Sequence, residues 1–302
     1  MKTLPDSIRV FERGWLSANN ILLVGPDDTA LVDSGYVTHA PQTVALVRHA
    51  LQDRALDRLY TTHLHSDHCG GNAALQAQYA CATYVPAEEE DKVRRWDEDA
   101  LTFKATGQQC PRFTIAGTVA PGDVLTLGGE VWHVLGAPGH HAHSLIWYCP
   151  RHKVLISADA LWHNGFGVIF PELEGDAGFA EAAATLDVIA GLDVDIVIPG
   201  HGAVFDDVGA ALQRARRRLD FLSSKPSNNA EYGVKVLLKF LLLDRQRIAV
   251  ADVAPLLASI PVVVESNRRY LHKTEEELAV WTIKQLVRGL AAKVEGDFLV
   301  NA

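Results

Sequence analysis

The first half of the chain alternates short apolar runs with segments of helical periodicity. Runs at 30–35 and 58–65 are rich in β-branched and apolar residues and end at polar positions, so they predict strands. Segments 40–53 and 72–80 place apolar residues at helical spacing, with Asn72 as the candidate N-cap of the second helix. Strands that alternate with helices in this way predict sheets covered by helices.

The last third of the chain changes to a helical pattern. We expect a charged helix at 208–222, a polar linker at 223–233 and further helices beyond it. The tripeptide Glu-Gly-Asp at 295–297 predicts a small hairpin. The sequence therefore predicts a mixed α/β domain over residues 1–222 and a smaller, mainly helical domain over residues 223–302.

Composition narrows the class of protein. With 302 residues, 48% of them hydrophobic, the chain can bury at least one large core. Residues 1–15 lack the apolar centre of a signal peptide, and no run of about 18 apolar residues predicts a membrane span, so we expect a cytoplasmic protein. The formal net charge of −9 argues against a nucleic-acid partner. We interpret the basic run at 214–218 as a solvated helix face.

The segment THLHSDHCGG at 61–70 concentrates residues that bind metals. His63 and His65 are two positions apart, so an extended backbone projects both side chains to one side. Asp67 continues this alternation and His68 breaks it, so all four converge only if the chain turns into a helix there. Three imidazoles and a carboxylate suit zinc or another borderline divalent metal.

Three later apolar runs each end in one residue of a metal-binding type. His140 follows the run EVWHVLGAPG, Asp159 follows VLISA and His201 follows DIVIPG. The four cysteines show no CxxC spacing, and there is no GxSxG, P-loop or complete GxGxxG motif. We expect His141 to point away from the site. His143 stays open between a substrate contact, a hydrogen-bond partner of a ligand histidine and a plain turn residue.

The order of these motifs resembles the metallo-β-lactamase fold superfamily. HxHxDH, Pro-Gly-His, a strand ending in Asp and Pro-Gly-His-Gly follow one another within residues 33–202. The resemblance implies an α/β fold, an αββα sandwich with the metals at one edge. The helical tail resembles the small winged-helix-like domain of some members of this superfamily.

The resemblance also implies two divalent ions, for which we expect zinc, with iron or manganese as alternatives. It assigns the ligands of one ion as His63, His65 and His140, and those of the other as Asp67, His68 and His201. Asp159 would bridge the two ions, because a carboxylate offers one oxygen to each cation and an imidazole does not. Asp33 would accept a hydrogen bond that fixes the tautomer of a ligand histidine.

This ligand set predicts hydrolysis. Two metals about 3.5–4 Å apart hold a shared water, lower its pKa toward about 7 and polarise a carbonyl. Asp67 is the candidate catalytic residue, because its second oxygen would orient the resulting hydroxide and could pass a proton to the leaving group.

The pattern is most similar to the glyoxalase II-like hydrolases of thioesters, lactones and other esters, which predicts a small-molecule substrate. Cleavage of RNA, as in members related to a mitochondrial endoribonuclease, and persulfide dioxygenation at a single iron are the alternatives. Trp162, His163, Phe166 and Phe170 form an aromatic segment that either receives an apolar acyl or aryl substrate or packs against the sandwich. We expect no membrane partner, and a homodimer stays open.

Overall fold

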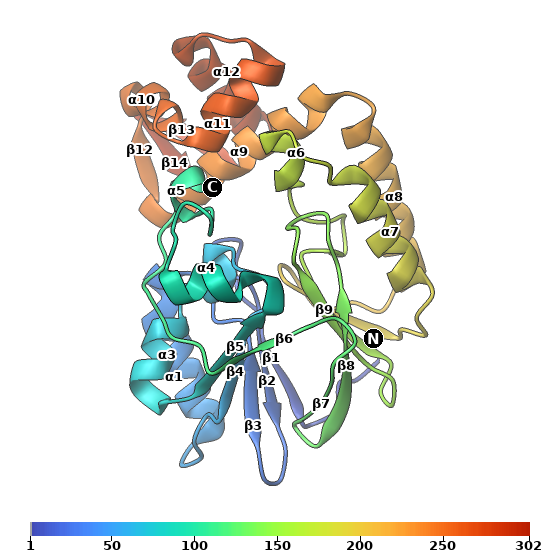
Figure 1. Ribbon diagram of the computed structural model, residues 1–302. Helices are drawn as coiled ribbons and strands as arrows, with labels where there is room; N and C mark the ends of the chain where they lie inside the picture. The colour runs from blue at the N-terminus through green and yellow to red at the C-terminus, as the bar shows by residue number, and fades with distance from the viewer. Residues whose placement is uncertain (1) are drawn as a thin grey trace.

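Two β-sheets lie at the centre of the protein, whose residues 2–302 are described by a computed structural model (Figure 1). The first sheet contains, in spatial order, β1 (Ile8–Phe11), β2 (Asn20–Val24), β3 (Thr29–Val32), β4 (Arg58–Tyr60), β5 (Ala82–Pro86) and β6 (Gly117–Val119). The second contains β11 (Ile196–Pro199), β10 (Val154–Ala158), β9 (Leu145–Cys149), β8 (Glu130–Gly136) and β7 (Val124–Leu127). The first sheet is parallel from β3 to β6, whereas the second is antiparallel except for the β10–β11 pair.

The two sheets share a buried core. Ile21 and Val32 of the first sheet belong to the same apolar cluster as Trp132 and Trp147 of the second. The rings of Tyr60 and Trp147 meet edge to face across the two sheets, with centroids 5.0 Å apart. Such aromatic pairs contribute beyond the area that they bury, so this contact helps to fix the sheets relative to one another.

Helices cover the outer face of each sheet. The first sheet is flanked by α1 (Ala40–Leu51), α2 (Ser66–Cys69), α3 (Asn72–Tyr79), α4 (Glu90–Arg95) and α5 (Phe103–Thr106). The second is covered by α7 (Phe179–Ala190) and α8 (Val208–Ser223), whereas the short helix α6 (Phe170–Glu174) packs against the C-terminal helices. Strands β3, β10 and β11 are buried on both faces and are mostly apolar, whereas β7 and β8 at the edge of the second sheet expose part of one face. The predicted αββα sandwich is confirmed (Figure 1).

The C-terminal region is mainly helical, as predicted. It contains α9 (Pro226–Arg245), α10 (Val253–Ala258), α11 (Pro261–Ser266) and α12 (Glu275–Arg288), with a small sheet of β12 (Arg247–Ala249), β14 (Phe298–Asn301) and β13 (Ala292–Glu295). Single 3₁₀ turns precede α1, α4 and α10, at Val37–His39, Ala87–Glu89 and Val250–Asp252, and a π-helical turn at Asn267–Leu271 follows α11. The hairpin expected around 295–297 joins β13 to β14.

Two local expectations are wrong. The polar stretch 223–233 is not a linker, because only Ser224 and Lys225 lie between α8 and α9. Pro226 occupies the first turn of α9, where its missing N–H costs nothing, and the buried Asn229 side chain donates to the Ile169 carbonyl. Asn72 does not cap α3, since its buried side chain instead pairs with the hydroxyls of Ser34 and Thr61.

Among the described residues, no single helix is both long enough and apolar enough to cross a bilayer. One sharply bent pair, Val250–Ala258 with Pro261–Leu271, meets the criterion by length and composition only when its two helices are taken together.

We expect Trp147→Ala to lower the free energy of unfolding by about 3–5 kcal/mol, because it removes a fully buried ring between the two sheets. The indole N–H of Trp147 has no hydrogen-bond partner among the described residues, so Trp147→Phe keeps most of the packing and gives a smaller loss. Urea unfolding of the two variants checks this. Equal losses would show that ring packing at Trp147 does not hold the sheets together.

Candidate metal centre

The side chains that the sequence singled out lie at the same edge of the sandwich, although they come from both sheets. The chain leaves β4 and reaches His63, His65 and then α2, which carries Asp67 and His68. His140 follows β8, Asp159 follows β10 and His201 follows β11. Each of these positions is fixed by a strand end or by the short helix α2 that follows β4.

The histidines and carboxylates approach one another closely. His65 Nδ1 lies 2.8 Å from His140 Nε2 and 3.1 Å from His63 Nε2. On the other side of the site, His201 Nε2 lies 3.1 Å from Asp67 Oδ2. Asp159 lies between these groups, with its Oδ2 3.3 Å from His140 Nε2 and 3.4 Å from His68 Nε2.

Three sets of side chains each bring their ligand atoms within 4.8 Å of one another. They are His63, His65 and His140; His63, His68 and Asp159; and Asp67, His68 and His201. All seven side chains expected to bind metal are therefore brought together, and all but Asp67 are buried.

The surroundings of two histidines show that this donor set fits divalent metal ions. His140 Nδ1 contacts the Val168 carbonyl and His68 Nδ1 lies 2.7 Å from Asp33 Oδ2, so both Nδ1 atoms carry the proton. The remaining Nε2 atoms then point lone pairs into the site. His68 Nε2 is buried and makes no hydrogen bond within the described chain, so it fits a metal ligand.

Burial and neighbouring charges set the protonation of the site. Burial, with the surrounding histidines, lowers the pKa of His63 and His65 well below its ordinary value, so both are neutral, as metal binding requires. Burial also acts to lower the pKa of His68, but Asp159 and Asp33 outweigh it and raise that pKa well above its usual value, so a metal ion at Nε2 would take the place of that nitrogen's proton. Burial would raise the pKa of Asp159, yet His68 and His201 lower it. The carboxylate is therefore ionised.

Asp33 is fixed tightly beneath the site. Its carboxylate accepts hydrogen bonds from the backbone N–H of Thr62 at 2.8 Å and from the Thr62 hydroxyl at 2.9 Å, in addition to His68. Its backbone has a φ of +60°, a left-handed conformation that costs energy for a residue with a Cβ. Ala158, directly before Asp159, is also left-handed, with φ +44°. The fold thus accepts strain at two positions that orient the site.

Gly200 allows the backbone to pass very close to the Asp159 carboxylate. A Cβ on this residue would lie 2.1 Å from Asp159 Oδ1, and the three residues Pro199, Gly200 and His201 pass directly beside that carboxylate. Gly167 has the same relation to His140, since its Cβ would lie 2.3 Å from the ring Nδ1. Only glycine fits at these two points without moving a ligand side chain.

The aromatic segment divides between the site and the core. The indole N–H of Trp162 donates to Asp159 Oδ1 at 3.1 Å, and the Phe170 ring lies 5.0 Å from His65. Phe166 is buried in the core beneath α7 and α8, and the half-exposed His163 pairs with Asp207 at 3.1 Å. The structure therefore brings Trp162 and Phe170 to the site but not Phe166 or His163.

His143 pairs with a carboxylate that the sequence did not single out. Its Nδ1 contacts Glu89, which is buried and also binds Lys92 Nζ at 3.0 Å. His141 lies in none of the metal-binding sets: its Nδ1 accepts from the backbone N–H of His143 at 3.2 Å and its Nε2 lies 3.9 Å from Glu89 Oε1, although its ring packs 5.1 Å from that of His65. Burial lowers the pKa of His141 to about 3. Glu89 lies in the acidic run at 88–91, which has the composition of a solvated helix start and so gives no signal of burial.

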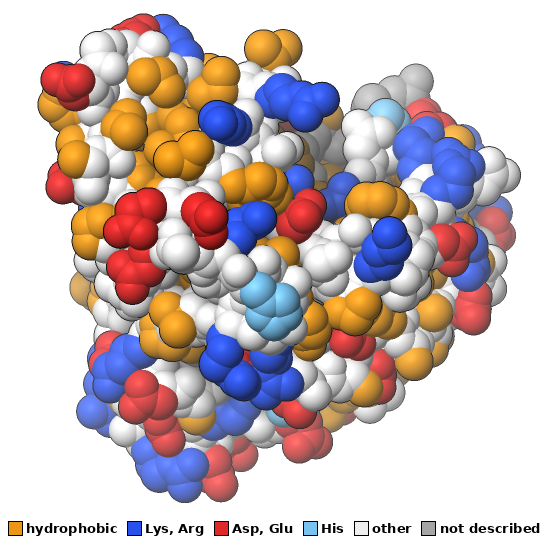
Figure 2. Space-filling view, turned by 90° about the horizontal axis from the view of Figure 1, so that it is seen from above, with side chains coloured by type: hydrophobic (Ala, Val, Ile, Leu, Met, Phe, Trp, Pro, Cys, Tyr) orange, Lys and Arg blue, Asp and Glu red, His pale blue; other side chains and the backbone are white. Residues whose placement is uncertain are grey.

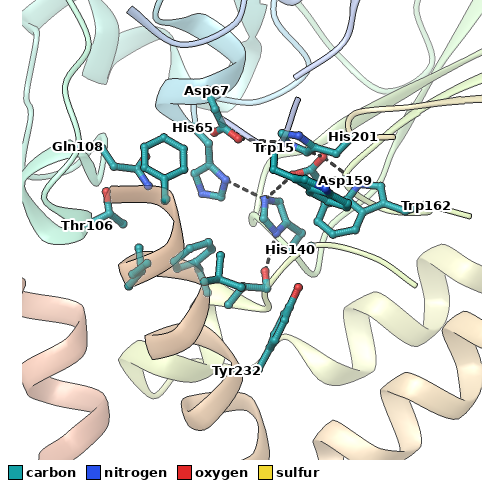
Figure 3. A pocket seen from close by; sticks show the side chains of 16 residues that line it. Trp15, His65, Asp67, Thr106, Gln108, His140, Asp159, Trp162, His201 and Tyr232 are labelled. Atoms are coloured by element: carbon teal, nitrogen blue, oxygen red, sulfur yellow. Dashed lines mark hydrogen bonds and ion pairs between the residues drawn. The ribbon is translucent and has the colours of Figure 1, made fainter. Parts of the chain in front are cut away.

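A cavity of about 80 Å³ opens above these residues (Figure 3). Trp15 lies at its edge with 55% of its surface exposed, and its ring stacks on His201 at 5.5 Å. Helix α9 forms the opposite wall, from which Tyr232 faces the site in Figure 3. Sequence reasoning missed Trp15 and Tyr232, because neither belongs to a motif and each reaches the site only through the fold.

Residues 13–201 match the family model described as the metallo-beta-lactamase superfamily. With the sandwich and the site already described, this match shows that the chain belongs to that superfamily.

Sequence relatives carry the name hydroxyacylglutathione hydrolase. The protein of that name from Brucella anthropi is 28% identical over 245 residues, which cover 77% of this chain and 79% of the relative. The one from Idiomarina loihiensis is 32% identical over 117 residues, which cover 39% of this chain and 37% of the relative, so this match spans little more than a third of that protein.

Solved structures share the fold. A metallo-beta-lactamase family protein from Thermus thermophilus superposes with a TM-score of 0.59 at 18% identity and covers 99% of this chain and 100% of its own. The B3 metallo-beta-lactamase BLEG-1 superposes with a TM-score of 0.54 at 22% identity, over 68% of this chain and 96% of its own. At these identities the likeness concerns the fold alone.

We expect Gly200→Ala to weaken metal binding by roughly 10–100-fold, because the added methyl group displaces the Asp159 carboxylate. Competition with a chromophoric chelator measures the affinity. Gly209→Ala is the matched control, since a Cβ at that position has no atom within 4 Å. Unchanged affinity in Gly200→Ala would contradict a ligand role for Asp159.

Proposed function

We propose that this protein is a metal-dependent hydrolase that cleaves a thioester, a lactone or another ester of a small molecule. The observation that carries the proposal is the convergence of seven metal-binding side chains on one site whose histidine tautomers are fixed by Asp33 and by the Val168 carbonyl. The name of the sequence relatives, hydroxyacylglutathione hydrolase, supports a thioester or related acyl substrate.

In this proposal His63, His65 and His140 would hold one divalent ion, and Asp67, His68 and His201 would hold the other. Asp159 lies between the two sets and serves both. Such ions, with zinc preferred over iron or manganese for this donor set, supply an activated water and polarise the carbonyl of the substrate.

The remaining steps belong to side chains of the protein. Asp67 has one oxygen facing His201 and borders the cavity, so its other oxygen orients the attacking water, accepts its proton and returns a proton to the leaving group. Trp162 holds the Asp159 carboxylate in place through its indole N–H. The walls formed by Trp15 and α9 limit access of bulk water to the reacting carbonyl.

Surface charge favours a small substrate over RNA. On the face of the described chain in Figure 2, Lys and Arg side chains are interspersed with Asp, Glu and apolar ones. The basic run on α8 is partly neutralised, because Arg214 pairs with Asp207 at 2.8 Å and Arg216 pairs with Asp187 at 2.7 Å. Arg218 lies over the Tyr232 ring, with its guanidinium carbon 4.2 Å from the ring centroid.

We expect Asp67→Ala to lower kcat by roughly 100-fold to 10,000-fold, because it removes the group that orients the water and carries its proton. Steady-state kinetics on the best substrate of the wild type checks this. Asp91→Ala, at an exposed position of α4, is the control and should leave kcat unchanged. Near-normal activity of Asp67→Ala would show that the assigned metal core is wrong.

A substrate panel tests the reaction class. We expect the zinc-loaded protein to hydrolyse at least one of a hydroxyacylglutathione thioester, an aliphatic lactone and an aryl ester, to lose this activity with a chelator and to regain it with zinc. Single-stranded RNA should remain intact. Cleavage of RNA without hydrolysis of any acyl substrate would contradict the proposal and favour a phosphodiesterase. Oxygen-dependent turnover of a glutathione persulfide by the iron form alone would favour a dioxygenase.

A further inference from the structure

A second and larger cavity adjoins the metal centre. Its volume is about 390 Å³, within the range of small-molecule sites, whereas the space directly over the histidines is about 80 Å³. Trp15 and Trp162 line both spaces, together with Tyr232 of α9, so the two spaces are adjacent. A substrate whose carbonyl lies at the metal centre can therefore extend one arm into the larger cavity.

One face of α9 makes this cavity apolar. Tyr232, Val236, Phe240 and Leu243 recur at spacings of four, four and three residues, so they lie on one side of the helix. Trp15 and Trp162 form the facing wall and meet edge to face, with ring centroids 5.2 Å apart. These surfaces match an apolar acyl or aryl group better than the amide-rich backbone of a peptide.

Lys235 and Lys239 are the charged side chains that line this cavity, and their surroundings differ. Lys239 Nζ donates to the Ala291 carbonyl at 2.6 Å and also to Asn301, so it serves the structure of the C-terminal region. Lys235 is half-buried and makes no hydrogen bond or ion pair with the described residues. Its ammonium group is available to a ligand.

The surroundings of Lys235 favour an anion. Burial lowers its pKa, while the carboxylate of Glu231 on the preceding turn opposes this shift and Arg218 adds to it. A half-buried ammonium without an acceptor is costly, and a carboxylate placed beside it forms a charge-assisted hydrogen bond. Gln285 of α12 lines the same cavity and offers an amide donor to the second oxygen.

We propose that this cavity is the substrate-specificity site, and that it binds an apolar acyl or aryl arm ending in a carboxylate at Lys235. The inference rests on the proposed hydrolase function and adds the substrate class, which is an ester or thioester of an amphiphilic organic acid. The C-terminal helix α9 then selects the substrate, while the sandwich supplies the reacting groups.

Binding of a product-like acid tests the site without turnover. Isothermal titration with octanoate and with the neutral octanamide should show at least tenfold tighter binding of octanoate to the wild type. Lys235→Gln should remove this difference, and Lys235→Arg should restore it. Lys293→Gln removes the same charge from an exposed position of the C-terminal region and should change nothing. Equal binding of octanoate and octanamide to the wild type, or octanoate binding unchanged in Lys235→Gln, would overturn the proposal.

Kinetics separate a failure of this site from a failure of the hydrolase function. We expect 4-nitrophenyl monoesters of C6 to C10 dicarboxylic acids to have a kcat/KM at least tenfold above that of their methyl-capped counterparts, with the ratio near one in Lys235→Gln. 4-Nitrophenyl acetate, which is too short to reach Lys235, should react equally with both proteins. A ratio near one in the wild type, with acetate hydrolysis intact, would overturn the specificity site alone. Absence of hydrolysis of every ester by the metal-loaded wild type would contradict the hydrolase function.

Discussion

The burial of five imidazoles and one carboxylate against one another at the edge of the two sheets is the constraint on which the structure depends. His63, His65, His68, His140, His201 and Asp159 are almost fully withdrawn from water, and several of their ligand atoms lie within 3.5 Å of each other. Buried polar groups without suitable partners are destabilising. Divalent cations relieve this arrangement, because they bind to the lone pairs that the hydrogen bonds of Asp33 and Val168 leave free.

The sandwich holds these buried ligand side chains in position relative to one another. Ligand side chains come from the ends of β4, β8, β10 and β11, so both sheets must keep their relative position, and the shared core around Trp132 and Trp147 fixes it. Backbone strain at Asp33 and Ala158 and the close approach of Gly200 occur beside these ligands. Strain of this kind persists only where the surrounding structure overdetermines it.

The sequence predicts those parts of the fold and of the site that depend on residues close together in the chain. Strands that end in His or Asp, and the spacing of His63, His65, Asp67 and His68, could be predicted because each depends on neighbouring residues. Glu89, Trp15 and Tyr232 could not, because their roles arise from contacts between distant segments. The polar composition of the stretch at 223–233 predicts a linker, whereas burial of Asn229 and Ala230 against the sandwich keeps it helical.

The sandwich and the C-terminal region have different roles in the proposed function. The sandwich fixes the metal-binding groups, and α9 of the C-terminal region closes one side of the cavity and carries Lys235.

Elemental analysis of the metal-loaded protein, combined with anomalous diffraction from its crystals, tests directly whether the seven side chains bind two metal ions. We expect two ions per chain, about 3.5–4 Å apart, with Asp159 between them. A single ion, or ions bound away from these seven side chains, would contradict it.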